Sequence, residues 1–142
     1  MKVENFRCYR EKTPVEIDDL TVFIGKNDAG KSSILDALAI FFDEKAAPDA
    51  DDACVHTESS DVKITGIFSD FPAELVLDAT HPTSLETEHL LNSDGLLEIT
   101  KTYRCSGSGK GALKAVHARA MHPTTPSFDD LLSLTITALR GR

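Results

Sequence analysis

The 142-residue sequence has no apolar run near the roughly 18 residues that a membrane-spanning helix needs, so we expect no membrane span. Its first twelve residues contain no apolar stretch typical of a secretory signal. Its cysteines, Cys8, Cys54 and Cys105, lie far apart, are odd in number and form no CxxC pair. This spacing argues against a disulfide framework or a zinc site. Together these absences predict a cytoplasmic protein.

The composition is that of an ordinary globular protein, with 41% hydrophobic and 27% charged residues. This is too apolar for a disordered chain, and 8 glycines and 6 prolines are too few for a fibrous one. The length suits one compact domain and is too short for two full ones.

The net charge of −8 is unevenly distributed. Residues 43–61 and 62–100 each carry a charge of −6, whereas residues 101–142 hold seven Lys or Arg against two Asp, or +5. An acidic total argues against a protein that coats nucleic acid with its whole surface. The basic tail still permits a local contact, within a screening length of about 8 Å.

Residues 1–43 are predicted to contain short strands, a turn at Gly25 and a helix. The apolar, β-branched stretch Leu20–Ile24 is typical of a strand buried on both faces in a parallel sheet. From about Lys31 to Asp43 the apolar residues recur at helical spacing. The predicted buried face of this helix consists of Ile34, Leu35, Leu38, Phe41 and Phe42.

Residues 44–61 are predicted to form a solvated acidic loop, and residues 62–122 a β-rich segment. Its predicted strands are Val62–Phe68, Leu75–Leu77, Leu97–Cys105 and Leu113–Met121. Within it, Thr83–Glu86 resembles a capping box for a brief helix through Leu91, and Asn92–Gly95 is a strong turn signal. Residues 123–142 are predicted to begin a helical segment, with a cap at Ser127–Asp130.

The most informative motif is GKNDAGKS at residues 25–32, which matches G-x-x-x-x-G-K-[ST]. Gly25 and Gly30 allow a tight turn and a close backbone approach to phosphates. The intervening N–H groups form an anion-binding nest, and the following helix adds its free N–H groups and dipole. We expect Lys31 to contact the β- and γ-phosphates and Ser32 to ligate Mg²⁺. The predicted nucleotide site comprises Gly25, Lys26, Asn27, Asp28, Ala29, Gly30, Lys31, Ser32 and Ser33.

Two other segments imitate phosphate-site motifs. Ile40–Glu44 resembles an apolar strand ending in Asp-Glu, but it lies only 12 residues after Lys31 and continues the helical periodicity. We therefore interpret Asp43 and Glu44 as the end of the helix. The segment SGSGKG at residues 106–111 has Arg104 where a second phosphate loop needs glycine, so we interpret it as a hairpin tip.

The motif and its surroundings resemble a known family. VENFRCYRE, an apolar strand and IGKNDAGKSSILDALAIFFD resemble the N-terminus of SMC/RecF-type ATPases of the ABC class, most closely the overcoming-lysogeny-defect (OLD) family of ATP-dependent endonucleases. VKITGIFSDFP and LLNSDGLLEITKTYRC are similar to the β-rich stretch that follows in those proteins. The resemblance implies a partial P-loop NTPase fold of the α/β class: the N-terminal part of an ATPase head with an antiparallel β-rich subdomain.

By resemblance, two such heads enclose two ATP molecules, each between one head's P-loop and the other's signature motif. The resemblance also implies that Arg7 lies near the nucleotide edge and that Asn27 shapes the loop. Members of the family often act on DNA, and the OLD type carries a C-terminal nuclease domain.

The sequence departs from that family in several places. It contains no glutamine, so the Q-loop glutamine is missing, and no signature, Walker B strand or switch histidine is found. We therefore expect an N-terminal portion of a head that binds ATP and Mg²⁺ but hydrolyses ATP very slowly or not at all alone. The expected partners are a second copy or another chain that completes the head, and DNA by resemblance.

Two alternatives remain open at this point. A complete small P-loop kinase or GTPase would share the loop, although the sequence has no N-K-x-D or D-x-x-G motif. A non-catalytic DNA- or partner-binding module would use the basic tail and the hairpin at Lys110.

Overall fold

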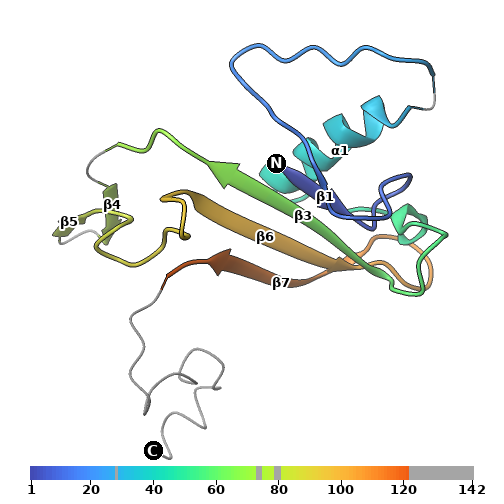
Figure 1. The fold of residues 1–142 in the computed structure, drawn as a ribbon. Helices are drawn as coiled ribbons and strands as arrows, with labels where there is room; N and C mark the ends of the chain where they lie inside the picture. Colours follow the sequence, from blue (N-terminus) through green and yellow to red (C-terminus); the bar gives the residue numbers. More distant parts are fainter. Residues whose placement is uncertain (28, 73–74, 79–80, 122–142) are drawn as a thin grey trace, which may run out of the picture.

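The structure is a computed structural model that describes residues 1–27, 29–72, 75–78 and 81–121 (Figure 1). Within these ranges, only the backbone is described for residues 75–78 and 81–82. The short elements are β1 (Lys2–Glu4), β2 (Thr13–Pro14), the 3-10 turn η1 (Ala50–Asp52), β4 (Leu75–Asp78) and β5 (His81–Thr83). The longer elements are α1 (Lys31–Phe42), β3 (Asp61–Phe68), β6 (Leu97–Arg104) and β7 (Ala112–Arg119).

Five of the strands form one sheet in the order β2-β1-β3-β6-β7, and every neighbouring pair is antiparallel. β4 and β5 form a separate antiparallel pair. At the start of β6, the Oδ1 atom of Asn92 accepts hydrogen bonds from the amides of Asp94 (2.9 Å) and Leu96 (3.0 Å). Gly95 supplies the left-handed conformation of this turn, with φ 72°. The predicted turn is therefore confirmed, and the four predicted strands of the β-rich segment are observed with small shifts in their bounds.

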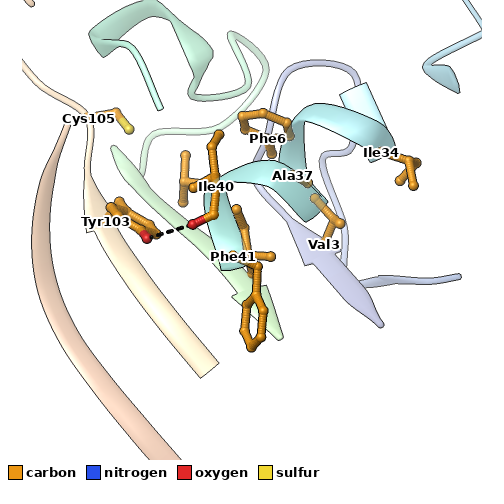
Figure 2. Packing of buried hydrophobic residues seen from close by; sticks show 10 residues of the cluster. Val3, Phe6, Ile34, Ala37, Ile40, Phe41, Tyr103 and Cys105 are labelled. Carbon is orange, nitrogen blue, oxygen red and sulfur yellow. Dashed lines mark hydrogen bonds between the residues drawn. The ribbon is translucent and has the colours of Figure 1, made fainter. Parts of the chain in front are cut away.

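Helix α1 packs on one face of the sheet and completes the core (Figure 2). Val62 and Ile64 of β3 are fully buried beneath it. Gly66 of β3 lets the Phe41 ring lie against the strand, because a Cβ there would stand 2.5 Å from the ring. Figure 2 also shows the Tyr103 hydroxyl directed at the carbonyl oxygen of Ile40, at 3.4 Å. The core thus lies between the helix and the middle of the sheet.

Helix α1 confirms the predicted helix at Lys31, and its end at Phe42 confirms that Asp43 follows the helix rather than ending a strand. The buried face is rotated from the predicted one. Leu35 and Phe42 are exposed, because the helix has only the sheet on one side among the described residues. The observed buried face consists of Ser33, Ile34, Ala37, Ile40 and Phe41.

The prediction of a buried strand at Leu20–Ile24 is wrong for this structure. The stretch belongs to no strand, and Leu20, Val22 and Ile24 are 84%, 68% and 91% exposed. It lies in the open arch that the chain makes between β2 and α1 (Figure 1). A parallel strand needs hydrogen-bonded neighbours on both sides, and the described residues supply none for this stretch.

Two further predictions need correction. The segment Leu85–His89 forms turns instead of a helix, although Ser84 Oγ does accept the Thr87 amide at 3.1 Å. Residues 44–61 are not wholly solvated, because Pro48 and Cys54 are buried beside the sheet. The predicted helical segment at residues 123–142 lies outside the described residues.

In the part of the chain that the structure describes, no helix combines the length and the apolar character needed to cross a bilayer.

Candidate functional site

The site is built around the N-terminus of α1. Gly30 precedes the helix with φ 83° and ψ 4°, and no side chain caps it. The first helical hydrogen bond runs from the Ile34 amide to the Gly30 carbonyl oxygen, at 3.2 Å. The amides of the first helical turn have no partner within the helix, and they add to the positive end of its dipole. This helix end is therefore suited to an anion.

Gly30 packs tightly against the N-terminal hairpin, which consists of β1, β2 and the loop between them. A Cβ at this position would stand 2.7 Å from both Cys8 Sγ and Tyr9 Oη. The Tyr9 hydroxyl donates a hydrogen bond to the Gly30 carbonyl oxygen at 3.1 Å. Both the left-handed backbone and the lack of space require glycine here. Burial raises the pKa of Tyr9, so its hydroxyl remains a donor at neutral pH.

The Lys31 ammonium folds back over the preceding loop. Its Nζ atom lies 2.8 Å from the Gly25 carbonyl oxygen and 2.5 Å from that of Lys26. The Ala29 amide also donates to the Lys26 carbonyl oxygen, at 3.3 Å. The lysine side chain therefore closes the loop on itself and places a positive charge at the start of α1.

An open cavity of about 570 Å³ lies against this loop and helix end. Ser32 is exposed at its surface, whereas Ser33 is only 8% exposed. The cavity has the size of a small-molecule site. Its lining residues are Arg7, Cys8, Asn27, Gly30, Lys31, Ser32 and Ser33.

Arg7 contributes a second cation to this cavity. Its Nε donates to Asp52 Oδ1 at 2.8 Å, and its Nη1 pairs with Asp36 of α1. These two carboxylates, Asp52 foremost, raise the pKa of Arg7. Its guanidinium carbon also lies 4.9 Å from the centre of the Phe6 ring. The side chain is thus fixed in orientation while about a third of it remains exposed.

The structure brings together six of the predicted site residues around one cavity: Arg7, Asn27, Gly30, Lys31, Ser32 and Ser33. Gly25, Lys26 and Ala29 form the adjoining loop, in which Lys31 contacts the carbonyl oxygens of Gly25 and Lys26 and the Ala29 amide donates to that of Lys26. Asp28 lies outside the described residues.

Sequence reasoning missed the residues that brace the site. Tyr9 contacts Gly30, which lies 21 residues away in the sequence, and Asp52 contacts Arg7, which lies 45 residues away. Such separations leave no local periodicity or spacing to detect. The described residues include no group of three or more His, Cys, Asp or Glu side chains arranged to hold a metal ion.

The structure also pairs the basic side chains of the second half with the acidic segments. Asp61 binds both Arg104 and Lys114, the latter at 2.6 Å. Asp49 lies 3.0 Å from Lys110, and Glu98 lies 4.0 Å from Arg119. These four cations of the basic tail therefore serve as counter-charges to the acidic middle of the chain.

Comparisons with curated proteins and with solved structures each gave no match. A family model described as the AAA ATPase domain matches residues 1–142, the whole of the sequence. This match is consistent with a helix end that is suited to an anion and lies beside a lysine, because ATPases bind nucleotide. The chain belongs to the AAA ATPase domain family.

Proposed function

We propose that the chain binds ATP with Mg²⁺ through a Walker A loop formed by residues 25–33. The observation that carries the proposal is the uncapped start of α1 at Gly30, which opens into the cavity beside Lys31. A glycine that admits no Cβ, unpaired helical amides and an ammonium at one point are the features that a phosphate chain requires.

The residues present fit the proposed ligands. The loop and helix amides with Lys31 would hold the phosphates, and the exposed Ser32 hydroxyl offers a ligand to Mg²⁺. When bound, the ion would neutralise phosphate charge. Lys31 must exchange its contacts with the carbonyl oxygens of Gly25 and Lys26, at least in part, for contacts with phosphate.

Hydrolysis by this chain alone is expected to be very slow. Phosphoryl transfer needs a group that orients the attacking water and a further ligand for the metal. The cavity lining in the described part of the chain contains no carboxylate or histidine, and Asp36 nearby is already paired with Arg7. We therefore propose that another segment or chain supplies these groups.

The finer assignment to an OLD- or SMC-like ATPase in DNA processing rests on the sequence resemblance. Two features are consistent with it: Arg7 lines the same cavity as the loop, and an antiparallel β-rich segment follows α1. Direct DNA contact by the basic tail has less support, since four of its cations already have acidic partners.

The deciding experiment is a calorimetric titration of the chain with ATP and Mg²⁺, beside Lys31→Ala and Lys12→Ala. Lys12 is exposed and does not line the cavity, so it controls for the loss of one positive charge. We expect micromolar binding by the parent chain and Lys12→Ala, and at least about a tenfold loss in Lys31→Ala, because charge-assisted hydrogen bonds are lost. Equal affinity in all three folded proteins would refute the assignment of the loop.

A further inference from the structure

Arg7 of the cavity is held by a residue far away in the sequence, Asp52 of η1. The Arg7 amide donates a hydrogen bond to the Asp52 carbonyl oxygen at 2.7 Å, and the Arg7 Nε donates to Asp52 Oδ1 at 2.8 Å. Arg7 has a φ of 51°, a left-handed conformation that residues other than glycine rarely adopt. Asp52 therefore fixes both the backbone and the side chain of a residue whose conformation needs support from its surroundings.

The carboxylate of Asp52 is itself fixed within η1. Its Oδ2 atom accepts a hydrogen bond from the Asp49 amide at 2.7 Å, and the Asp52 amide donates to the Asp49 carbonyl oxygen at 3.0 Å. The side chain of Asp52 is only 14% exposed. Because both carboxylate oxygens are engaged, rotation of this side chain would break two hydrogen bonds at once.

The segment that carries Asp52 is also joined to the hairpin tip at residues 106–111. The Ala50 amide donates to the Gly109 carbonyl oxygen at 2.7 Å, and the Gly111 amide donates to the Pro48 carbonyl oxygen at 2.7 Å. These backbone bonds hold η1 from a second direction in the sequence, besides its bonds with Arg7. The hairpin tip thus supports the position of Asp52.

Asp36 of α1 contacts Arg7 in a different way. It pairs with Nη1, and its side chain is 49% exposed, compared with 14% for Asp52. Ion pairs this exposed contribute little. No hydrogen bond joins Nη2 to another residue in the part of the chain that the structure describes. A phosphate could therefore replace Asp36 and bind a guanidinium that Asp52 has already oriented, as bidentate contacts require.

We infer that Asp52 is a positioning residue for nucleotide, which orients Arg7 toward the phosphates, and that Asp36 pairs with Arg7 until a phosphate replaces it. The inference rests on the proposed function, because Arg7 lines the same cavity as the loop. It also distinguishes two carboxylates that are alike in charge. Repulsion of phosphate alone predicts that removing either carboxylate tightens binding. Positioning predicts opposite effects, with weaker binding after loss of Asp52 and tighter binding after loss of Asp36.

The test is a calorimetric titration of the full 142-residue chain with ATP and Mg²⁺, with Asp52→Asn and Asp36→Asn as the matched variants. Asp52→Asn should bind at least about fivefold more weakly, because Arg7 loses a charge-assisted hydrogen bond and its orientation. The new amide oxygen can still accept the Asp49 amide, so the turn is retained. Asp36→Asn should bind about two- to fivefold more tightly, the range of an exposed ion pair.

The Arg7→Ala background separates positioning from damage to the fold. In this background Asp52→Asn should weaken binding no further, because the side chain that it positions is absent. Arg7→Lys gives a second measurement, since it keeps the charge but lacks the Nε–H group that Asp52 accepts. It should bind about as weakly as Asp52→Asn.

Four results would overturn the inference: unchanged or tighter binding in Asp52→Asn, weaker binding in Asp36→Asn, an equal loss from Asp52→Asn in the Arg7→Ala background, or parent affinity in Arg7→Lys. If Lys31→Ala loses binding while Asp52→Asn does not, the proposed function stands and this inference alone fails. If the folded parent chain does not bind ATP, the proposed function fails and the inference fails with it.

Discussion

The chain contains two apolar, β-branched stretches that differ in burial, Val62–Phe68 and Leu20–Ile24. The first lies in β3, with β1 on one side and β6 on the other, and its Ile64 is fully buried. The second has no strand beside it in the described residues, and its Ile24 is 91% exposed. An apolar, β-branched composition is thus not sufficient for burial, because burial also requires neighbouring strands.

Truncating one isoleucine to alanine in each stretch should give the largest difference in the free energy of unfolding. Ile64→Ala should lower the free energy of unfolding by about 2–5 kcal/mol, because it leaves a cavity under α1. Ile24→Ala should change it by no more than about 0.5 kcal/mol, since the side chain has little to lose. Urea unfolding at submicromolar concentration, where self-association is minimal, measures both. Similar losses at the two positions would mean that the second stretch is also packed.

A second comparison sets two left-handed glycines against each other. In Gly30→Ala the new Cβ meets Cys8 and Tyr9, whereas in Gly95→Ala it meets nothing within 4 Å. We expect a loss of about 1 kcal/mol at Gly95 from the backbone conformation alone, and about 2–3 kcal/mol at Gly30. Thermal or urea unfolding gives the difference. If both variants lose equally, the hairpin is not tightly packed against Gly30.

The carboxylate of Asp61, at the start of β3, should make a smaller, pH-dependent contribution to stability. Hydrogen bonds from Arg104 and then Lys114 lower the pKa of Asp61 to about 2. A lowered folded-state pKa stabilises the fold above the unfolded pKa of about 3.9, and this stabilisation disappears as the pH falls toward 2. Because both cations are half-exposed, solvent screening limits it to about 1 kcal/mol at pH 7.

Asp61→Asn tests this contribution, with Asp19→Asn at an exposed position as its control. The free energy of unfolding, measured from pH 7 to pH 2, should differ between the parent chain and Asp61→Asn by an amount that shrinks steadily below about pH 4. The control should follow the parent chain at every pH. A gap at pH 2 as large as that at pH 7 would assign the effect to packing or hydrogen bonding instead of charge.

The elements that the sequence predicted correctly are those with local causes. Helix α1 follows from apolar spacing after Gly30, and β6 from alternation after the Asn92–Gly95 turn. The position of the loop at the start of α1 follows from adjacent glycine and helix signals, whereas its role in binding nucleotide stays a prediction. What failed depended on distant groups: the burial of Leu20–Ile24, and the bracing of the site by Tyr9.

The arch between β2 and α1 is fastened at both ends. Met1 and Val15 exchange backbone hydrogen bonds of 2.6 and 2.8 Å at one end, and Tyr9 holds Gly30 at the other. Extending a loop with fixed ends costs only about 0.6 kcal/mol for each doubling of its length. Residues or a reporter peptide inserted between Asp18 and Asp19 should thus leave the sheet and helix intact, which makes the arch a position where the length of this protein can change without a change of fold.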